Sequence, residues 1–335
     1  MRRKYHSNHK KIALITLKTI ENVKGKTNLN LIKLADEYAL DVFGSQIYAP
    51  WLYVYSAISG QFKEGWIPDN YYGKIVVPKL KGNYGIIGDF NGLTNRVFNS
   101  SYFPVKAYRI NNLWWTPQYQ VISDQDLSDI IFEKSEKVVF KIDNSIQGKG
   151  VYFFDKNNFS LDKVKGLGNG VFQKFIKQHS FFNNIMSKSV ATIRITSVTN
   201  NEGKASIRSC YLRVGRIEDS HVKSSSHIRI PINVVTGELN MFGYNTFWQE
   251  IESHPDSEFV FQDKIIPSFN KCIEAALSLH EHIPFVRSIG WDMIIDENSE
   301  VQVMEWNGLH NDIKFSEATQ GPCFSDLGWE KLWKF

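Results

Sequence analysis

The sequence has few cysteines and no long apolar run, and each of these absences argues against a class of protein. The 335 residues include only Cys210, Cys272 and Cys323, which are widely separated and form no CxxC pair. The sequence therefore predicts neither a zinc site nor a disulfide framework, and we expect a reducing cytoplasm. No stretch approaches the roughly 18 to 20 apolar residues of a membrane span. The apolar run from Ile12 to Leu17 is also too short for a secretory signal.

A large charge of one sign is missing as well. The chain has 39 Lys and Arg against 35 Asp and Glu, a formal net charge of +4. This excess is too small to indicate nucleic acid as a partner, although it suits anionic ligands such as nucleotides or acidic sugars. We interpret the basic start, MRRKYHSNHKK, as a solvated arm, with loose contact to an anionic membrane as the alternative.

The pattern along the chain predicts a mixed α+β (α/β) fold. We find no internal repeat and no low-complexity tract, and the length allows two or three packed lobes. Residues 10–62 read as mainly helical, and residues 65–90 read as short β-rich pieces. Further on we expect strands at 137–143, 151–154, 170–176, 191–199, 206–214 and 228–235, a helix at 267–280 and a hairpin at 288–307. Many short antiparallel strands argue against a doubly wound parallel sheet.

The most informative segment is SIGWDMIIDENSEVQVMEWNG, from Ser288 to Gly308. If residues 297–300 form a four-residue hairpin loop, Ile294 lies opposite Val303 and Asp292 lies opposite Glu305. Side chains alternate along a strand, so Asn307 shares the face of Glu305. Two carboxylates and one amide oxygen therefore meet at one end of an apolar face.

Paired carboxylates repel each other unless a cation lies between them. Hard oxygen ligands without Cys or His suit Mg²⁺, with Mn²⁺ as an alternative, and Mg²⁺ leaves its other positions to water and phosphate. We therefore predict a divalent metal site at Asp292, Glu305 and Asn307. The alternative is an exposed hairpin with solvated acids, for which Trp291 and Trp306 are unsuitable neighbours.

Two further segments are candidates for nucleotide binding. In KVVFKIDNSIQGKGVYFF, Lys141 lies on a strand that leads into Gln147 to Gly150, and glycine-exposed backbone amides with nearby lysines can hold phosphate. This is not a P-loop, because GxxxxGK[ST] is absent. In VFQKFIKQHS, the strand from Val171 can run past an adenine, or it is simply a buried strand.

The order of these pieces resembles the ATP-grasp superfamily, and in particular the sugar-transfer-associated ATP-grasp family found with polysaccharide biosynthesis. The matching segments span roughly residues 93–308 and read FKIDNSIQGKGV, QKFIKQHS, SVATIRITSV, VVTGEL, GWDMIID and VMEWNG. The resemblance implies an ATP-grasp fold with domains at 1–90 (mainly helical), 91–180 (first lobe) and 181–335 (second lobe).

The resemblance also implies roles for individual residues. Lys141 would contact the nucleotide phosphates, and Arg194 would reach the γ-phosphate or an acyl phosphate. The loop folded over the phosphates would be Gln147, Gly148, Lys149 and Gly150, and the adenine would be lined by Gln173, Lys174, Phe175 and Ile176. Asp292, Glu305 and Asn307 would hold one or two Mg²⁺ against the phosphates of ATP. Arg96 stands loosely where the family often has a lysine, and Ser225-Ser226-His227 replaces the usual Gly-Gly stretch.

The chemistry implied by the family is ligation of a carboxylate to an amine through an acyl phosphate. Arg213, Arg216 and Arg229 follow Arg194 on predicted strands and are candidates to clamp an anionic substrate, with Arg213 also a catalytic candidate; surface arginines are the alternative. His179, His221 and His227 are possible general bases.

The family context suggests a cytoplasmic enzyme that joins an amino acid or other amine to a sugar acid, such as a hexuronic acid, for a surface polysaccharide such as a capsule or O-antigen. The partners would be small molecules, with no nucleic acid, and a homodimer is compatible with the sequence. Two other functions stay open: a kinase that phosphorylates a sugar or polyol hydroxyl, and a non-catalytic nucleotide-binding partner in a biosynthetic complex.

Overall fold

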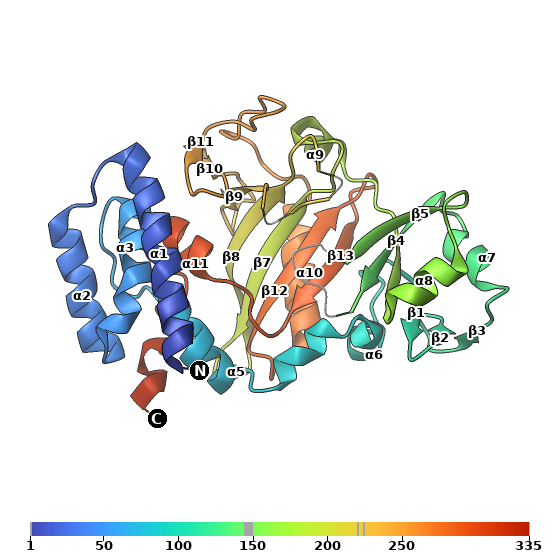
Figure 1. The fold of residues 1–335 in the computed structure, drawn as a ribbon, viewed down its shortest axis with the longest axis horizontal. Coiled ribbons are helices and arrows are strands. Elements are labelled where there is room, and N and C mark those ends of the chain that lie inside the picture. The colour runs from blue at the N-terminus through green and yellow to red at the C-terminus, as the bar shows by residue number, and fades with distance from the viewer. Residues whose placement is uncertain (1, 144–149, 220, 224, 335) are drawn as a thin grey trace.

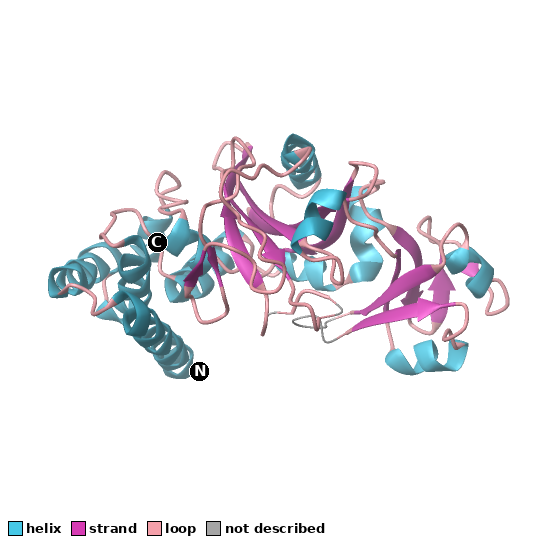
Figure 2. Ribbon diagram, turned by 90° about the horizontal axis from the view of Figure 1, so that it is seen from above, coloured by secondary structure: helices cyan, strands magenta, loops and turns pink. Residues whose placement is uncertain are grey.

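The computed structural model describes residues 2–143, 150–219, 221–223 and 225–334. The molecule is elongated and has three parts in a row, with a helical region at one end, a large sheet in the middle and a small sheet at the other end (Figure 1). Figure 2 shows the same row from a direction at right angles to the first. Within the described ranges, no helix is long and apolar enough to cross a membrane.

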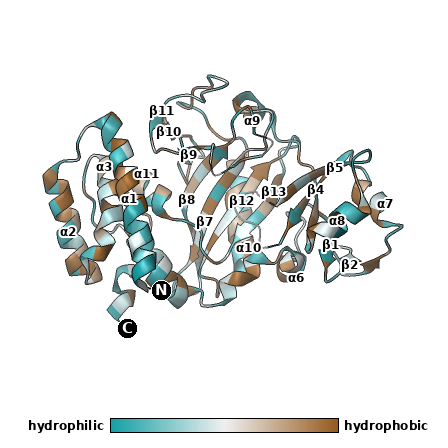
Figure 3. Cartoon of the chain, in the orientation of Figure 1, coloured by the Kyte–Doolittle hydropathy of each residue, from teal (hydrophilic) through white to brown (hydrophobic). Residues whose placement is uncertain are grey.

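The helical region is formed by residues 2–98, which confirms the predicted helical N-terminal region. The α2 helix begins where Asn28 accepts a hydrogen bond from the Asn30 N–H, and it ends at Gly44, whose φ of 73° suits glycine. Figure 3 shows both polar and apolar colours on α1 and α2, as expected for helices that pack on one side only. The elements are α1 (Arg2–Lys24), α2 (Leu29–Phe43), η1 (Gln46–Tyr48), α3 (Ala49–Ser59), α4 (Asp69–Tyr71), η2 (Tyr72–Val76), α5 (Val77–Leu80), η3 (Tyr84–Asp89), η4 (Asn91–Leu93) and α6 (Thr94–Phe98).

The β-rich pieces expected at 65–90 are absent, and this prediction is wrong. The segment KIVVP forms parts of η2 and α5, and YGIIGDF lies mainly in η3. Pro78 lies in a continuous helical run from Asp69 to Leu80, directly after the π-helical turn η2. Val76 and Val77 are buried in the core of the helical region. Packing here overrides the preference of β-branched residues for strands.

The small sheet is antiparallel, with the strand order β3-β2-β1-β6-β4-β5. Its core packs Phe140 and Phe172 against the short helices α7 (Leu127–Phe132) and α8 (Leu161–Leu167). Gly170 is needed where β6 passes β4, because a Cβ atom there would lie 2.3 Å from the Lys141 carbonyl oxygen. The strands are β1 (Val105–Ile110), β2 (Leu113–Trp115), β3 (Val121–Ile122), β4 (Lys137–Ile142), β5 (Val151–Asp155) and β6 (Gly170–Lys174).

The large sheet is also antiparallel, in the order β11-β10-β9-β8-β7-β12-β13. The α10 helix (Phe269–Glu281) covers one face of the central strands, and the short α9 (Ser180–Ile185) lies beside their ends (Figure 1). The opposite face carries the candidate site. The strands are β7 (Thr192–Thr199), β8 (Ala205–Val214), β9 (Ile228–Ile232), β10 (Gly243–Tyr244), β11 (Glu250–Ile251), β12 (Ser288–Ile295) and β13 (Val301–Asn307). Two antiparallel sheets confirm the predicted mixed α+β architecture.

The end of the chain returns to the helical region. The α11 helix (Lys314–Thr319) packs on α3, and η5 (Trp329–Lys334) lies near α2 (Figure 1). Glu317, on α11, joins the end of the chain to the helical region. Its fully buried carboxylate accepts hydrogen bonds of 2.7 Å from the N–H groups of Ile67 and Cys323. Burial raises the pKa of Glu317 from 4.5 to about 7, although these hydrogen bonds act in the opposite direction.

We expect the free energy of unfolding to fall as the pH rises from about 4.5 to about 7. The folded state holds the Glu317 proton more tightly than the unfolded chain does, so the stabilisation is complete below pH 4.5 and lost as the pH passes 7. The change amounts to about 3 kcal/mol. Urea unfolding across this range should show a smaller loss for Glu317→Gln than for the wild type. The control Glu281→Gln, on the exposed face of α10, should keep the wild-type slope; equal slopes for all three proteins would contradict the assignment.

Candidate active site

The β12–β13 hairpin brings the predicted metal ligands together. Asp292 lies directly opposite Glu305, and Gly290 lies opposite Asn307. The predicted pairing of the two carboxylates is therefore confirmed. The predicted loop is wrong, because Ile294 lies opposite Gln302 and Ile295 opposite Val301, so the turn is longer.

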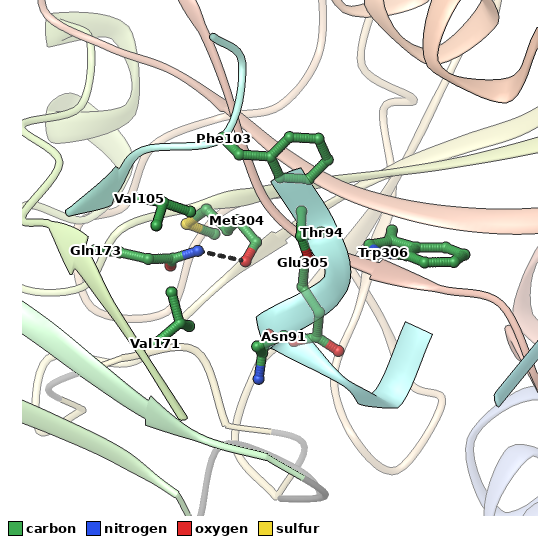
Figure 4. A pocket seen from close by; sticks show the side chains of 9 residues that line it. All are labelled: Asn91, Thr94, Phe103, Val105, Val171, Gln173, Met304, Glu305 and Trp306. Atoms are coloured by element: carbon green, nitrogen blue, oxygen red, sulfur yellow. Dashed lines mark hydrogen bonds between the residues drawn. The ribbon is translucent and has the colours of Figure 1, made fainter. Parts of the chain in front are cut away.

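A β-bulge at Met304 explains why the two carboxylates pair as predicted although the hairpin loop is longer than predicted. The register shifts between Asp292 and Met293, so Met304 has no partner across the hairpin. The bulge moves the register by one residue and restores the pairing of Asp292 with Glu305. It also frees the Met304 carbonyl, which accepts hydrogen bonds from Lys141 Nζ at 2.9 Å and from Gln173 Nε2 at 3.4 Å. The latter contact is drawn in Figure 4.

Two arginines hold the Asp292 carboxylate. Arg194 Nε lies 2.5 Å from Oδ1 and Arg194 Nη2 lies 2.9 Å from Oδ2, while Arg213 Nη2 lies 2.5 Å from Oδ2. Burial by itself would raise the pKa of Asp292, but Arg194 and then Arg213 outweigh it and lower the pKa to about 2. The carboxylate is therefore ionised. Gly290 leaves room for this pair, because a Cβ atom there would lie 3.1 Å from Arg194 Nη1.

Glu305 is the unpaired carboxylate of the site. Its side chain is open to solvent, and within the described part of the chain no hydrogen bond or ion pair involves it. The surrounding protein and then the Asp292 charge raise its pKa, and Lys141 opposes them. Lys141 is half-buried, and desolvation lowers the pKa of its ammonium despite the two nearby carboxylates. An additional cation at Glu305 would offset the repulsion between the Glu305 and Asp292 carboxylates.

A pocket opens between the two sheets beside Glu305 (Figure 4). The small sheet contributes Val105, Val171 and Gln173 from β1 and β6, and the hairpin contributes Glu305 from β13. The Glu305 carboxylate points toward Asn91, which holds the end of β4 by donating to Asp143 Oδ1 from N at 3.1 Å and from Nδ2 at 3.0 Å. The pocket lining is completed by Thr94, Phe103, Met304 and Trp306.

The predicted adenine segment borders this pocket only in part. Gln173 is buried and lines the pocket, whereas Ile176 belongs to the core of the large sheet. Lys174 is exposed, and its N–H bonds to the Pro104 carbonyl at 2.8 Å. Phe175 packs near Phe153. The backbone groups of Phe175 and Ile176 form no hydrogen bond with another described backbone group, so they are available to a base edge.

Two other predicted groups remain, the phosphate loop and Arg96. Gln147, Gly148 and Lys149 lie outside the described residues, and the neighbouring Gly150 ends the loop with its carbonyl 3.0 Å from the Ile142 N–H. Arg96 is exposed on α6, and its guanidinium lies over the Tyr119 ring at 4.4 Å; it is not one of the described residues that line the pocket.

The residues present fit a divalent cation. No three His, Cys, Asp or Glu side chains in the described ranges form a metal cluster, so a cation here depends on two carboxylates, an amide and the phosphates of a nucleotide. Among the described residues, neither carboxylate oxygen of Glu305 is bonded, and Asn307 uses only its Nδ2, which donates to the Gly290 carbonyl at 3.3 Å. All donors are hard oxygens, which suits Mg²⁺.

The three arginines predicted as a clamp separate into two groups. Arg213 and Arg229 lie opposite each other on β8 and β9, on the face that also bears Arg194. Arg216 instead pairs with Asp256, at 2.6 Å between Nη2 and Oδ1, and lies outside the site. The clamp prediction is therefore wrong for Arg216.

Among the predicted bases, His179 caps α9 by accepting the Phe181 N–H at 3.1 Å. His221 packs against the Phe153 ring, at 6.3 Å between centroids. Burial lowers the pKa of His227 to about 3, with Arg229 and Arg213 adding to the effect, so this imidazole is neutral.

The sequence analysis missed the contribution of the segment after β13. Asn311 is fully buried, its carbonyl accepts Arg194 Nη1 at 3.4 Å, and its side chain binds Tyr72 and Lys81 of the helical region. Lys81 also donates to the Leu309 carbonyl at 3.0 Å, and burial lowers its pKa well below its ordinary value. A run of polar residues directly after the EWNG motif was the available signal.

Comparisons with known proteins agree with this architecture. The family described as sugar-transfer associated ATP-grasp matches residues 159–325. No curated protein is significantly similar to the chain in sequence.

Several solved structures are similar. An ADP complex of N5-carboxyaminoimidazole ribonucleotide synthetase is 12% identical, covering 76% of this chain and 56% of its own, with a TM-score of 0.43. The Staphylococcus aureus N5-carboxyaminoimidazole synthetase with ADP is 13% identical over 71% and 49%, with a TM-score of 0.44. A Campylobacter jejuni biotin carboxylase with β,γ-ATP is 10% identical over 96% and 68%, with a TM-score of 0.45. The chain thus spans about half the length of the first two structures. By the family match over residues 159–325, the chain belongs to the sugar-transfer-associated ATP-grasp family.

Proposed function

We propose that the protein is an ATP-dependent ligase that joins a carboxylate to an amine through an acyl phosphate. The observation that carries the proposal is the hairpin end, where Asp292 and its two arginines, the unbonded Glu305 and Asn307 share one face beside an inter-sheet pocket. Charged groups of both signs, fixed before any ligand arrives, are what transfer of a phosphoryl group requires.

Each part of the site has a role in this proposal. The nucleotide lies between the sheets, with Gln173 to Ile176 along the base and Lys141 toward the phosphates. Asp292, Glu305 and Asn307 hold Mg²⁺, with Mn²⁺ as an alternative; when bound, the ion neutralises phosphate charge. Arg194 and Arg213 are held by Asp292, so their remaining N–H groups are oriented toward the γ-phosphate and the acyl phosphate.

The reaction proceeds in two displacements. An oxygen of the substrate carboxylate attacks the γ-phosphorus, the bond to the β-phosphate oxygen breaks, and ADP leaves. The amine gives up its ammonium proton and attacks the acyl carbon. The carbon–oxygen bond to phosphate then breaks, phosphate leaves, and the remaining excess proton is lost from nitrogen. Arg194 and Arg213 stabilise the charge that develops on the transferring phosphoryl group.

The family context suggests the substrates, namely a sugar acid such as a hexuronic acid and an amino acid, for a surface polysaccharide made in the cytoplasm. The test is a screen of uronic acids crossed with amino acids in the presence of ATP and Mg²⁺. Hydroxylamine is added in parallel to trap any acyl phosphate as a hydroxamate.

We expect ADP and free phosphate only when acid and amine are both present, with a product whose mass is that of acid plus amine less one water. A phosphorylated sugar or polyol would show a kinase instead. Absence of any ATP-dependent product or hydroxamate would contradict the ligase proposal and favour a non-catalytic nucleotide-binding role.

A further inference from the structure

Arg229 is a buried cation that forms no ion pair with any residue the structure describes. It is 8% exposed, and its guanidinium lies over the rings of Phe315 at 4.2 Å and Trp248 at 4.7 Å. Between the residues that the structure describes, no hydrogen bond or ion pair involves this side chain, and its Nε is fully buried. Stacking on two rings offsets part of the cost of burial, but it offers no acceptor for the N–H groups. A guanidinium in this setting is prepared for an anion that is not part of the chain.

Asp312, in the segment that follows β13, carries the charge opposite to that of Arg229. Its Oδ2 lies 2.7 Å from Lys314 Nζ, whereas its Oδ1 is buried without a partner among the described residues. Lys314 also approaches Oδ2 of Asp69 at 3.9 Å, and Asp69 is a 2%-exposed residue of the helical region whose Oδ1 has no partner in the described ranges either. Asp312 and Asp69 therefore each have one buried carboxylate oxygen without a hydrogen-bond partner among the described residues.

Arg229 and Asp312 are neighbours that do not touch. Arg229 lies over the ring of Phe315 at 4.2 Å, and Lys314, the residue before Phe315, pairs with Asp312 at 2.7 Å, so the same short segment brings the two groups close in space. Their nitrogen and oxygen atoms are nevertheless more than the 4.0 Å of an ion pair apart. Arg229 instead stacks on its two rings, and Asp312 instead pairs with Lys314.

The space between Arg229 and Asp312 lies next to Arg213 and Arg194, the two arginines that hold Asp292. Arg229 is the cross-strand partner of Arg213, and Arg213 is bonded to Asp292. On the other side, the carbonyl of Asn311, next to Asp312, accepts a hydrogen bond from Arg194. A ligand between Arg229 and Asp312 would lie beside the two arginines that the proposed function assigns to the acyl phosphate.

We propose that the amine substrate binds in this space and that it is an α-amino acid, with its carboxylate on Arg229 and its ammonium on Asp312. The inference rests on the proposed ligase function. A simple amine would leave Arg229 without an anion, and a dicarboxylic acid would face Asp312 with a like charge. One small zwitterion satisfies both ends, and Asp69 of the helical region lies nearby, 3.9 Å from the Lys314 ammonium that pairs with Asp312.

The experiment compares each amino acid with the amine that lacks its carboxylate: serine with ethanolamine and alanine with ethylamine. Hydroxylamine, which needs no charged pocket, reports acyl phosphate formation in the same assay. We expect the wild type to prefer the amino acid over its matched amine by about a hundredfold or more, because a site built for a charged group rejects ligands without it. In Arg229→Gln, this preference should fall by about tenfold to a hundredfold.

Asp312→Asn is the second variant, and it should raise the KM for the amino acid by about tenfold relative to the hydroxamate rate. Arg216→Gln removes a guanidinium whose pair with Asp256 lies outside the site, and the preference should match the wild type. An unchanged preference in Arg229→Gln, or a wild type that uses simple amines as well as amino acids, would overturn the inference. Equal loss of hydroxamate and amide in both variants would also overturn it, since both residues would then act in activating the acid. A wild type that forms no hydroxamate from any acid refutes the ligase proposal itself, a result distinguishable from these.

Discussion

Replacing Glu305 by glutamine is expected to lower kcat/KM by at least about a hundredfold while leaving the fold intact. The Glu305 carboxylate is open to solvent and makes no hydrogen bond or ion pair within the described part of the chain, so its removal costs the folded state little. Of the three predicted metal ligands, Glu305 is nevertheless the one whose side chain makes no hydrogen bond or ion pair among the described residues. Steady-state ATP hydrolysis or ligation, measured beside circular dichroism, tests both halves of this expectation.

Asp292→Asn should be at least as damaging, because Asp292 also positions Arg194 and Arg213. Removing its charge leaves the buried Arg194 and the partly buried Arg213 with one less partner, so a loss of about 3 to 5 kcal/mol in stability is expected in addition. Glu305→Gln is therefore the cleaner test of the metal site. Glu297→Gln, at the exposed turn of the same hairpin, is the matched control and should keep wild-type activity. Wild-type turnover in Glu305→Gln or Asp292→Asn would refute the metal assignment.

Lys141→Ala should weaken ATP binding by more than about tenfold, which corresponds to about 1.4 kcal/mol. The Lys141 ammonium is already oriented by the Met304 carbonyl at 2.9 Å, and it lies near the two carboxylates of the site. A phosphate oxygen would therefore meet a positioned charge and not a mobile one.

Isothermal titration with ATP and Mg²⁺ measures this change. The control is Lys156→Ala, an exposed lysine just beyond β5 that should bind ATP as the wild type does. Affinity for ATP that is the same in Lys141→Ala and the wild type would remove Lys141 from the nucleotide site.

The candidate site was predictable where chemistry and strand alternation coincide. Asp292, Glu305 and Asn307 stand out because charged and amide groups are unusual between Trp291 and Trp306. Their common face follows from a period of two residues. The loop was predicted wrongly because a bulge at Met304 shifts the register. No feature of the sequence VQVMEWN predicts this bulge. Two compensating errors, in the loop and in the bulge, left the pairing of the carboxylates correct.

Long-range packing sets the limit of the sequence reading. Val76 and Val77 look like strand residues locally but are buried in a helical core. Arg213, Arg216 and Arg229 look equivalent in the sequence, yet only Arg213 and Arg229 share the site, because Arg216 lies beyond β8 and meets Asp256. The roles of Asp69 and Lys81 depend on how the helical region meets the segment after Asn307, and contacts between residues so distant in the chain leave no local pattern.

The central claim is that a divalent ion and a nucleotide meet at the end of the β12–β13 hairpin. The most direct measurement is a crystal structure with Mn²⁺ and a non-hydrolysable ATP analogue, in which anomalous scattering locates the ion. The account predicts the ion in contact with Glu305, with Asp292 and Asn307 around it and Lys141 on the phosphates. An ion and phosphates bound elsewhere, with Glu305 and Asn307 still facing water, would contradict it.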